Sequence, residues 1–492
     1  MMDLALLAVV LNPLNLLYLT AGFAVGFIFG IIPGLTATQA IALSLPFSFK
    51  MNPVQALIYI AGVYAGGQYS GTITGILINV PGTPAAAIPS REGYLLARKG
   101  HLAKAMAWAG LSTMAGGLIG MAILFFALPY LAQVVFMFTT ADKASLILFA
   151  IVLAALSTKY PMKGAVATML GMLFGMIGVD PVVPRTRLTF GTVGLSQGIN
   201  LITAVIGIFA VSEVLKQVIA WREEYSVPRT KVRLKDFLIN PREIASFIPQ
   251  YIKGALIGLF IGALPACGAA MATQVAYAEG ASRSKRREEY GTGSVEALAY
   301  THAAIGGLPP GALIPMLTFG IPGDSVTAVI LGAFLIHGLI PGPTLFSEQM
   351  HIVLPMLAAF PIAFILCYLT TPIFGPFVGK VIGVRKAFLY PFIMLVSLTG
   401  LWVMTYSPTQ LTLCVVLGVV SYLIERWGAS TISFFMGYML VPQFEYLFRI
   451  AWMVGGAEIF IKSPLSALFI LLTLVYTVYV IRNAIRKSKS GH

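Results

Sequence analysis

The chain has 492 residues, of which 58% are hydrophobic and only 10% are charged. Soluble domains carry about a quarter charged residues, so this composition excludes a cytosolic enzyme, a nucleic-acid-binding protein and a disordered scaffold. The net charge of +14 comes from 32 Lys and Arg against 18 Asp and Glu, and the basic residues cluster in short loops between apolar segments, which is typical of cytoplasmic loops. We therefore expect an all-α polytopic membrane protein that sits in a lipid bilayer and has no nucleic-acid partner.

Apolar segments long enough to cross a bilayer recur along the whole chain. A membrane-spanning helix needs about 20 apolar residues. Such stretches lie near residues 14–32, 54–80, 105–138, 144–158, 163–179, 199–219, 251–278, 311–340, 352–379, 387–405, 410–424, 430–441 and 465–482. Several are longer than one span or are broken by Gly and Pro, so we expect roughly a dozen transmembrane helices, with re-entrant hairpins as one form of the broken ones. The first stretch lacks a preceding basic segment and continues past Phe29, which predicts an uncleaved span.

The longest polar interval divides the chain into two halves. It covers residues 216–250 and is rich in Lys, Arg, Asp and Glu. We predict a first transmembrane repeat over 1–215, a cytoplasmic linker over 216–250 and a second transmembrane repeat over 251–492 with a cytoplasmic C-terminal tail. An interfacial helix within the linker is one alternative.

Two Gly/Pro motifs occur in the same order in both halves. The first has the spacing GxxxGxxxGxxP and recurs at an offset of 232 residues (265 − 33), and the second is a Pro-Gly pair that recurs at an offset of 241 residues (322 − 81). Their members are Gly22, Gly26, Gly30, Pro33, Gly254, Gly258, Gly262 and Pro265 for the first motif, and Pro81, Gly82, Pro322 and Gly323 for the second. Glycine at every fourth position lets helices pack closely, but two ordered motifs that recur together indicate a duplication.

Charge indicates that the two repeats have opposite orientations. The loop after the first Pro-Gly pair has four basic residues between Arg91 and Lys104, whereas the matching loop, residues 337–351, has no Lys or Arg. A basic cluster from Arg283 to Arg287 precedes the second pair, and the matching early loop has a single Lys. By the positive-inside rule, equivalent loops face opposite sides of the membrane. We therefore predict inverted-topology repeats with a cytoplasmic C-terminus and a non-cytoplasmic N-terminus.

Inverted repeats with Gly/Pro-broken helices are typical of secondary transporters. A Pro-Gly break at membrane depth frees backbone groups, because Pro lacks an N–H and Gly tolerates unusual dihedral angles. The N-terminus of the following half-helix presents N–H groups to an anion, while freed carbonyls and hydroxyls can coordinate a hard cation such as sodium. The predicted substrate- and ion-binding residues at the two breaks are Asn79, Pro81, Gly82, Thr83, Gly320, Pro322, Gly323, Asp324 and Ser325.

The polar residues at these breaks have a second interpretation as helix N-caps and shielded kinks. Asp324 is either a cap or a ligand of the coupling ion, since an unpaired carboxylate is costly inside a bilayer. A sodium site would then lie near Asp324 and Thr327. The earlier breaks carry Thr36 and Thr38, which as tips of re-entrant hairpins would close the site, although a threonine hydroxyl also bonds within its own helix.

The sequence contains no catalytic motif. HExxH, GxSxG and P-loop patterns do not occur, and the three cysteines lack zinc-site spacing. A membrane-embedded enzyme that uses His302 or His337 with Asp324 is an alternative without a motif to support it, because a lone membrane histidine more often makes a packing or interhelical hydrogen bond. We expect no enzyme activity, no cofactor and no bound metal other than the coupling cation.

The segments around the two Pro-Gly pairs carry a family resemblance. Residues 64–86, YAGGQYSGTITGILINVPGTPAA, and residues 311–323, GALIPMLTFGIPG, resemble the signature of the large membrane subunit of tripartite tricarboxylate transporters, the TctA family. Residues 92–94 and 97–100 agree with it as well, as do the length, the central linker and the motif order. The resemblance covers nearly the whole chain.

This resemblance implies a permease of the bacterial inner membrane that works with a small membrane subunit and a periplasmic solute-binding protein. It implies uptake of a small di- or tricarboxylate driven by a cation gradient, usually of sodium and alternatively of protons, with substrate-contacting loops at residues 79–83 and 320–325. The chain departs from the family pattern at residues 302–307, where HAAIGG replaces a Glu-Ser-Ala-Asn-Asn-like segment, and at Glu92, which replaces an Asp. The alternative function is a passive anion channel or pore.

Overall fold

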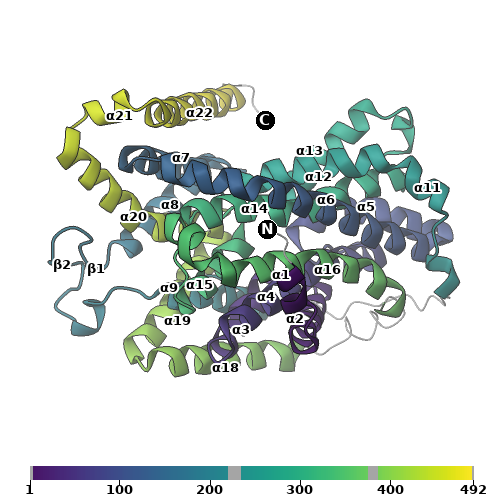
Figure 1. The fold of residues 1–492 in the computed structure, drawn as a ribbon, viewed down its shortest axis with the longest axis horizontal. Coiled ribbons are helices and arrows are strands. Elements are labelled where there is room, and N and C mark those ends of the chain that lie inside the picture. The colour runs from purple at the N-terminus through teal and green to yellow at the C-terminus, as the bar shows by residue number, and fades with distance from the viewer. Residues whose placement is uncertain (1–3, 220–233, 375–385, 490–492) are drawn as a thin grey trace. The chain divides into compact units, whose positions relative to one another are not determined.

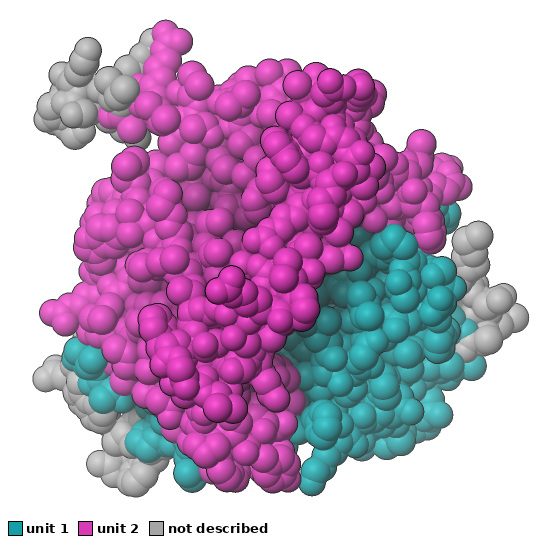
Figure 2. Space-filling view, turned by 90° about the vertical axis from the view of Figure 1, so that its left-hand side faces the viewer, with its two compact units in different colours: residues 1–129, 217–396 teal, residues 130–216, 397–492 magenta. Residues whose placement is uncertain are grey.

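The computed structural model describes residues 4–219, 234–374 and 386–489, most of which lie in α-helices (Figure 1). The predicted all-α class is therefore confirmed. The chain divides into two compact units, one of Met1–Pro129 and Gln217–Val396 and the other of Tyr130–Lys216 and Ser397–His492 (Figure 2). Each unit draws on both predicted repeats, so the division into 1–215, 216–250 and 251–492 stays a prediction.

Unit 1 contains most of the elements that surround the two Pro-Gly pairs. Its α-helices are α1 (Leu4–Val10), α2 (Pro13–Ile31), α3 (Ala37–Ser48), α4 (Pro53–Ile78), α5 (Ala87–Leu96), α6 (Leu102–Met137), α11 (Pro241–Ser246), α12 (Ile248–Ala263), α13 (Gly268–Arg283), α14 (Val295–Phe319), α15 (Ser325–Ile336), α16 (Met350–Phe374) and α18 (Lys386–Thr405). Its short 3-10 and π turns are Pro84–Ala86, Ala97–His101, Leu234–Phe237, Arg287–Glu289 and Leu345–Gln349. The helices α6 and α18 continue into unit 2.

Unit 2 combines helices with one small β-hairpin. Its α-helices are α7 (Thr140–Leu156), α8 (Pro161–Gly175), α9 (Leu201–Val205), α10 (Ser212–Ile219), α19 (Pro408–Arg426), α20 (Thr431–Gly455), α21 (Glu458–Lys462) and α22 (Pro464–Lys489). The strands β1 (Gly178–Val179) and β2 (Thr186–Arg187) pair antiparallel, with Gly178 opposite Arg187. A 3-10 turn at Val193–Leu195 follows, and a π-helical stretch at Ile206–Val211 joins α9 to α10.

Six helical segments among the described residues are long and apolar enough to cross a membrane. They are Pro13–Ile31, Pro84–Met137, Leu201–Ile219, Leu345–Ile373, Pro408–Arg426 and Pro464–Ala484. A pair of helices bent by 89°, Lys235–Ser246 and Ile248–Ala263, would make seven if it counts as one span. The chain is therefore a multi-pass membrane protein, while the count of roughly a dozen spans stays a prediction.

The glycine motifs of both halves pack against the backbone of a neighbouring helix. On α2, a side chain at Gly22, Gly26 or Gly30 would overlap a carbonyl oxygen of α4. On α12, the corresponding glycines lie against carbonyls of α14 in the same manner. The contacted carbonyls belong to residues 59, 63 and 67 in the first half and to residues 300, 304 and 308 in the second, each 241 positions later (300 − 59). The two helix pairs thus share one packing pattern, which requires glycine because the backbones touch.

The predicted helix breaks lie where the sequence places them. The helix α2 ends before Pro33 and Gly34, and α12 ends before Pro265, with Gly34 in the left-handed region at φ +92°. Farther on, α4 and α14 both end on a left-handed residue, Asn79 at φ 55° and Gly320 at φ 67°. A left-handed residue is a common C-terminal cap, and Gly and Asn are the residues that adopt it with least strain.

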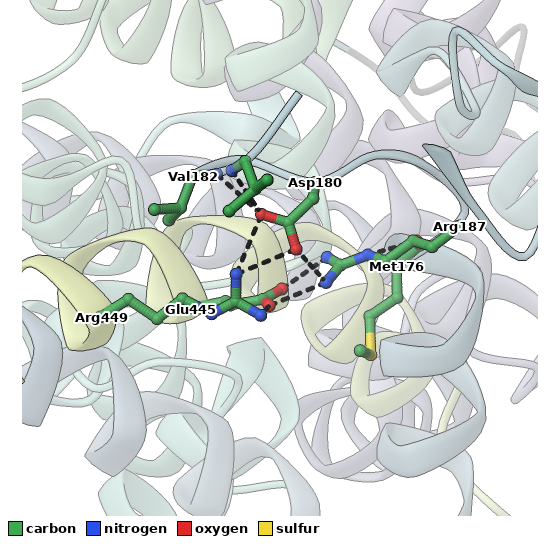
Figure 3. Close-up of polar contacts among 7 residues, drawn as sticks. Met176, Asp180, Val182, Arg187, Glu445 and Arg449 are labelled. Carbon is green, nitrogen blue, oxygen red and sulfur yellow. Dashed lines mark hydrogen bonds and ion pairs between the residues drawn. The ribbon is translucent and has the colours of Figure 1, made fainter. Parts of the chain in front are cut away.

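A cluster of four charged side chains fastens the β-hairpin of unit 2 to α20 (Figure 3). The carboxylate of Asp180 accepts from Arg187 at 3.0 Å and from Arg449 at 2.9 Å. Glu445 pairs with both arginines. The segment that follows carries the exposed side chain of Phe190. The sequence analysis predicted neither the hairpin nor this cluster.

The predicted linker is only partly described. Residues 220–233 lie outside the described residues, and so does the part of the predicted interfacial helix that falls there. At its ends, Lys216 belongs to α10 and forms an ion pair with Glu425, while α11 begins after Asn240, whose side chain accepts from the backbone N–H of Arg242. The structure also does not describe the side chains of the basic C-terminal residues after 484.

Candidate functional site

The first Pro-Gly break folds back onto the helices that precede it. The backbone N–H of Gly82 donates to the carbonyl of Gly71 on α4 at 3.0 Å. A side chain at Gly82 would overlap the carbonyl oxygen of Gly30 on α2, so the loop requires glycine here. Asn79 and Pro81 are exposed, whereas Gly82 and Thr83 are buried.

Hydroxyl groups without partners gather around this first break. Thr83 has an extended backbone immediately before the turn Pro84–Ala86, and its side chain makes no capping hydrogen bond. Thr83 Oγ1 and Ser70 Oγ are buried without a hydrogen-bond partner among the described residues. Both groups lie against glycines of the break, Thr83 against Gly71 and Ser70 against Gly30. An unpaired buried hydroxyl is costly, so these atoms are available to a ligand or to water.

The second Pro-Gly break is more deeply buried and carries a carboxylate. Gly323 lies against the carbonyl of Gly262 as Gly82 does against that of Gly30. Asp324 is the N-cap of α15 and is 4% exposed. Its Oδ1 accepts from the backbone N–H of Thr327 at 2.8 Å and from the Thr327 hydroxyl at 2.7 Å. Asp324 is therefore a helix cap, one of the two roles predicted for it.

Two contacts join the second break to the first half of the chain. The hydroxyl of Tyr64 on α4 donates to Asp324 Oδ2 at 2.8 Å. Thr38 Oγ1 on α3 lies 3.0 Å from Ser325 Oγ. Thr38, Asp324 and Ser325, all predicted from sequence, thus come together at the N-terminus of α15, with Tyr64 as a fourth member.

The predicted residues of the first half other than Thr38 lie apart from this cluster. Thr36 caps α3, and its backbone N–H donates to Gln39 Oε1 at 2.8 Å. No hydrogen bond within the described ranges joins Asn79 or Thr83 to the second break. The structure therefore brings together part of the predicted site and leaves the hydroxyls of Ser70 and Thr83 at the first break as a separate group.

The two histidines near the second break differ in burial. His302 is fully buried, and its Nδ1 lies 2.9 Å from the carbonyl oxygen of Leu298 one turn earlier. His337 is half-buried at the C-terminal end of α15. Neither histidine belongs to a metal-binding group, because the described part of the chain contains no cluster of three or more His, Cys, Asp or Glu side chains that could hold a metal ion.

Sequence reasoning missed two tyrosines of α4. Tyr64 bonds Asp324, and Tyr69 is hydrogen-bonded to Thr371 on α16. Both tyrosines lie in the segment 64–86 that carries the family resemblance, but their partners are 260 and 302 residues away. A spacing pattern within one segment cannot identify such partners, although a hydroxyl in an apolar helix signals that one is needed.

Comparison with known proteins identifies the family. The model of the tripartite tricarboxylate transporter TctA family matches residues 16–436. An uncharacterized 52.8 kDa protein of Agrobacterium vitis, from the TAR-I ttuC' 3'region, is 29% identical over 483 residues, which cover 97% of this chain and 95% of that protein. An uncharacterized protein from the TAR-II ttuC' 3'region of the same organism is 28% identical over 235 residues, or 47% of this chain and 97% of that protein. No solved structure matches. The chain belongs to the tripartite tricarboxylate transporter TctA family.

Proposed function

We propose that this chain is the permease subunit of a secondary active importer that takes up small di- or tricarboxylates together with a cation. Sodium is the proposed coupling ion and a proton is the alternative. The observation that carries the proposal is the cluster at the N-terminus of α15, where Tyr64 and Thr38 of the first half meet Asp324 and Ser325 of the second. Groups from both halves at one broken helix are what alternating access between repeats requires.

The proposed cation position is the carboxylate of Asp324. Its hydrogen-bond donors, from Thr327, Tyr64 and the backbone of Val326, are all neutral groups. It has no Lys or Arg partner among the described residues, and a buried charge without a counter-ion is unfavourable. A sodium ion near Asp324 and Thr327, or a proton on Asp324, would supply the missing positive charge.

The proposed anion contacts are neutral groups. Neither residues 79–83 nor residues 320–325 include a Lys or Arg. The unpartnered hydroxyls of Ser70 and Thr83 and the backbone of the two breaks can donate hydrogen bonds to a carboxylate instead. A weakly held anion of this kind suits transport, because the substrate must also leave.

Membership of the family supports a proposal for the partners and the location of the chain. A tripartite transporter has further subunits, and we propose a small membrane subunit together with a periplasmic solute-binding protein that delivers the substrate. We place the complex in the bacterial inner membrane, with the chain as two inverted repeats, 1–215 and 251–492, around a cytoplasmic linker at 216–250. The loop charges and the shared glycine packing of α2 on α4 and α12 on α14 support this arrangement.

Transport in proteoliposomes tests the proposal. The complete complex is reconstituted and supplied with a panel of labelled di- and tricarboxylates, citrate and succinate among them, with and without an inward sodium or proton gradient. We expect accumulation of at least one carboxylate above its equilibrium level only with an inward cation gradient. Accumulation that is indifferent to both gradients would contradict cation coupling, and equilibration without accumulation would identify a passive pore.

A further inference from the structure

Glu92 is a buried carboxylate to which the mechanism proposed above assigns no part. It lies on α5, the helix that follows the first Pro-Gly break, and is 1% exposed. Its oxygens accept four hydrogen bonds, from the Tyr277 hydroxyl at 2.7 Å, from the backbone N–H groups of Gly293 at 2.8 Å and Ser294 at 2.9 Å, and from the N–H of Gly291. Among the described residues no basic side chain pairs with it, so these four donors compensate for its loss of solvent.

All four donors belong to the second half of the chain. Tyr277 lies on α13, and Gly291, Gly293 and Ser294 form the segment that leads into α14. Ser294 is the N-cap of α14, a helix of 25 residues that ends at the second Pro-Gly break. Glu92 therefore places its negative charge at the N-terminus of α14, where the helix dipole favours an anion.

The loop conformation is built for this contact. Gly291 and Gly293 both have positive φ, +85° and +103°, which turns successive backbone N–H groups toward one side. A side chain at Gly293 would overlap the backbone of Leu96 at the end of α5. The segment and α5 thus meet backbone to backbone, on the side that the basic cluster from Arg283 to Arg287 marks as cytoplasmic.

We infer that Glu92 is a positioning residue that couples the two broken helices. It fixes α5, which begins at the first Pro-Gly break, to the N-terminus of α14, which ends at the second. A movement of the backbone at either break is then transmitted to the other break through the Glu92 carboxylate. Without this contact, the segment that leads into α14 would take up the movement. The link between the two breaks would serve the proposed transport, and the inference rests on the proposed function for that use alone. Its test measures the protection of backbone amides and needs no transport.

Amide hydrogen exchange on the purified full-length chain tests this role. Glu92→Gln keeps the side-chain length but leaves one oxygen for four donors. We expect exchange at least roughly tenfold faster in residues 288–298 and also in the peptides 79–86 and 320–327, which cover the two breaks. Glu92→Asp keeps the carboxylate and should restore part of the protection, as a charge-specific role requires.

Glu296→Gln is the matched control. Glu296 also lies near the start of α14, but its carboxylate accepts from Gln250 at 3.1 Å and Ser284 at 2.7 Å, neither of which lies in the first half. This variant should change exchange locally and leave peptide 79–86 unaffected. If Glu92→Gln does not fold, Tyr277→Phe removes a single donor and should give the same pattern in weaker form.

Two results would overturn the inference. In the first, Glu92→Gln or Tyr277→Phe speeds exchange only in residues 288–298 and near α5, with both breaks unchanged. In the second, Glu296→Gln disturbs the first break as strongly as Glu92→Gln does. Failure of carboxylate uptake in the transport assay would leave these exchange results standing, so the two proposals fail separately.

Discussion

At the scale of single residues, the two Pro-Gly breaks share a backbone but differ in chemistry. Gly82 and Gly323 both lie against the carbonyl of a glycine from an earlier helix, α2 in the first case and α12 in the second. The next residue is Thr83 in one break, with a free hydroxyl, and Asp324 in the other, with a hydrogen-bonded carboxylate. A neutral break suits an anion and an acidic break suits a cation, so the difference between Thr83 and Asp324 supports co-transport of the two.

Tyr64→Phe should destabilise the protein by about 1–3 kcal/mol, because it leaves a buried carboxylate oxygen without its donor. The ring contact with Phe360, at 6.0 Å between centroids, is retained. The measurement is the free energy of unfolding in mixed detergent micelles. Tyr59→Phe is the control, because the Tyr59 hydroxyl on the same helix lies 3.0 Å from the neutral hydroxyl of Ser44, and the loss of this bond should cost about 0.5–1 kcal/mol. Equal losses for both variants would contradict a special role for the Tyr64–Asp324 pair.

At the scale of elements, the sequence predicts the breaks better than the contacts between them. Pro33, Pro265 and the two Pro-Gly pairs end their helices for local reasons, namely a missing N–H and a left-handed cap, so their positions can be read from the chain. The bond of Tyr64 to Asp324 and the cluster of Arg187 with Glu445 join residues about 260 positions apart. No periodicity encodes such pairs, and they form only once the helices pack.

The attachment of the β-hairpin of unit 2 to α20 should depend on pH. The backbone N–H groups of Val183 and Val182, together with Arg449, lower the pKa of Asp180 to about 2. This pKa is below the ordinary aspartate value of about 3.9. The bonds of the ionised Asp180 carboxylate therefore stabilise the hairpin fully at pH values above about 3.9, and this stabilisation is lost as the pH falls through about 2. We expect the hairpin to stay attached at pH 4 and to detach near pH 2.

Pepsin, which is active across this range, measures the detachment by cleavage near the exposed Leu188 and Phe190. Cleavage should accelerate between pH 4 and pH 2 relative to a free peptide of the same sequence. Asp180→Asn should be cleaved rapidly already at pH 4. An Asp180→Asn variant as resistant as the unsubstituted protein would show that the carboxylate does not hold the hairpin.

At the scale of the whole molecule, the two compact units do not follow the two halves of the sequence. Each unit takes one segment from each half, and the pairs α2 with α4 and α12 with α14 repeat the same glycine contacts 241 positions apart. Composition was enough to predict a helical membrane protein, and motif order predicts a duplication, which the shared glycine contacts support. They could not predict which segments of the two halves assemble into one unit, because that depends on long-range packing.

The proposed inverted orientation of the repeats makes a separate prediction about accessibility. In a background without native cysteines, Lys99→Cys should react with an impermeant thiol reagent only after the cytoplasmic face is opened. Ser347→Cys, which is exposed in the matching loop of the second half, should react in intact spheroplasts. Labelling of both positions from the same side would contradict inverted repeats.

The central claim is that a carboxylate enters with a cation held at the second break, and the most direct test compares two aspartates. Both Asp324→Asn and Asp142→Asn alter a buried carboxylate of a helix capping box: Asp324 is the N-cap of α15, and Asp142 is the N3 residue of the box whose N-cap, Thr139, precedes α7. In proteoliposomes of the complete complex with an inward sodium gradient, the account predicts accumulation of labelled carboxylate by the unsubstituted protein and by Asp142→Asn, and none by folded Asp324→Asn. Gradient-driven accumulation by Asp324→Asn at the unsubstituted level would contradict it.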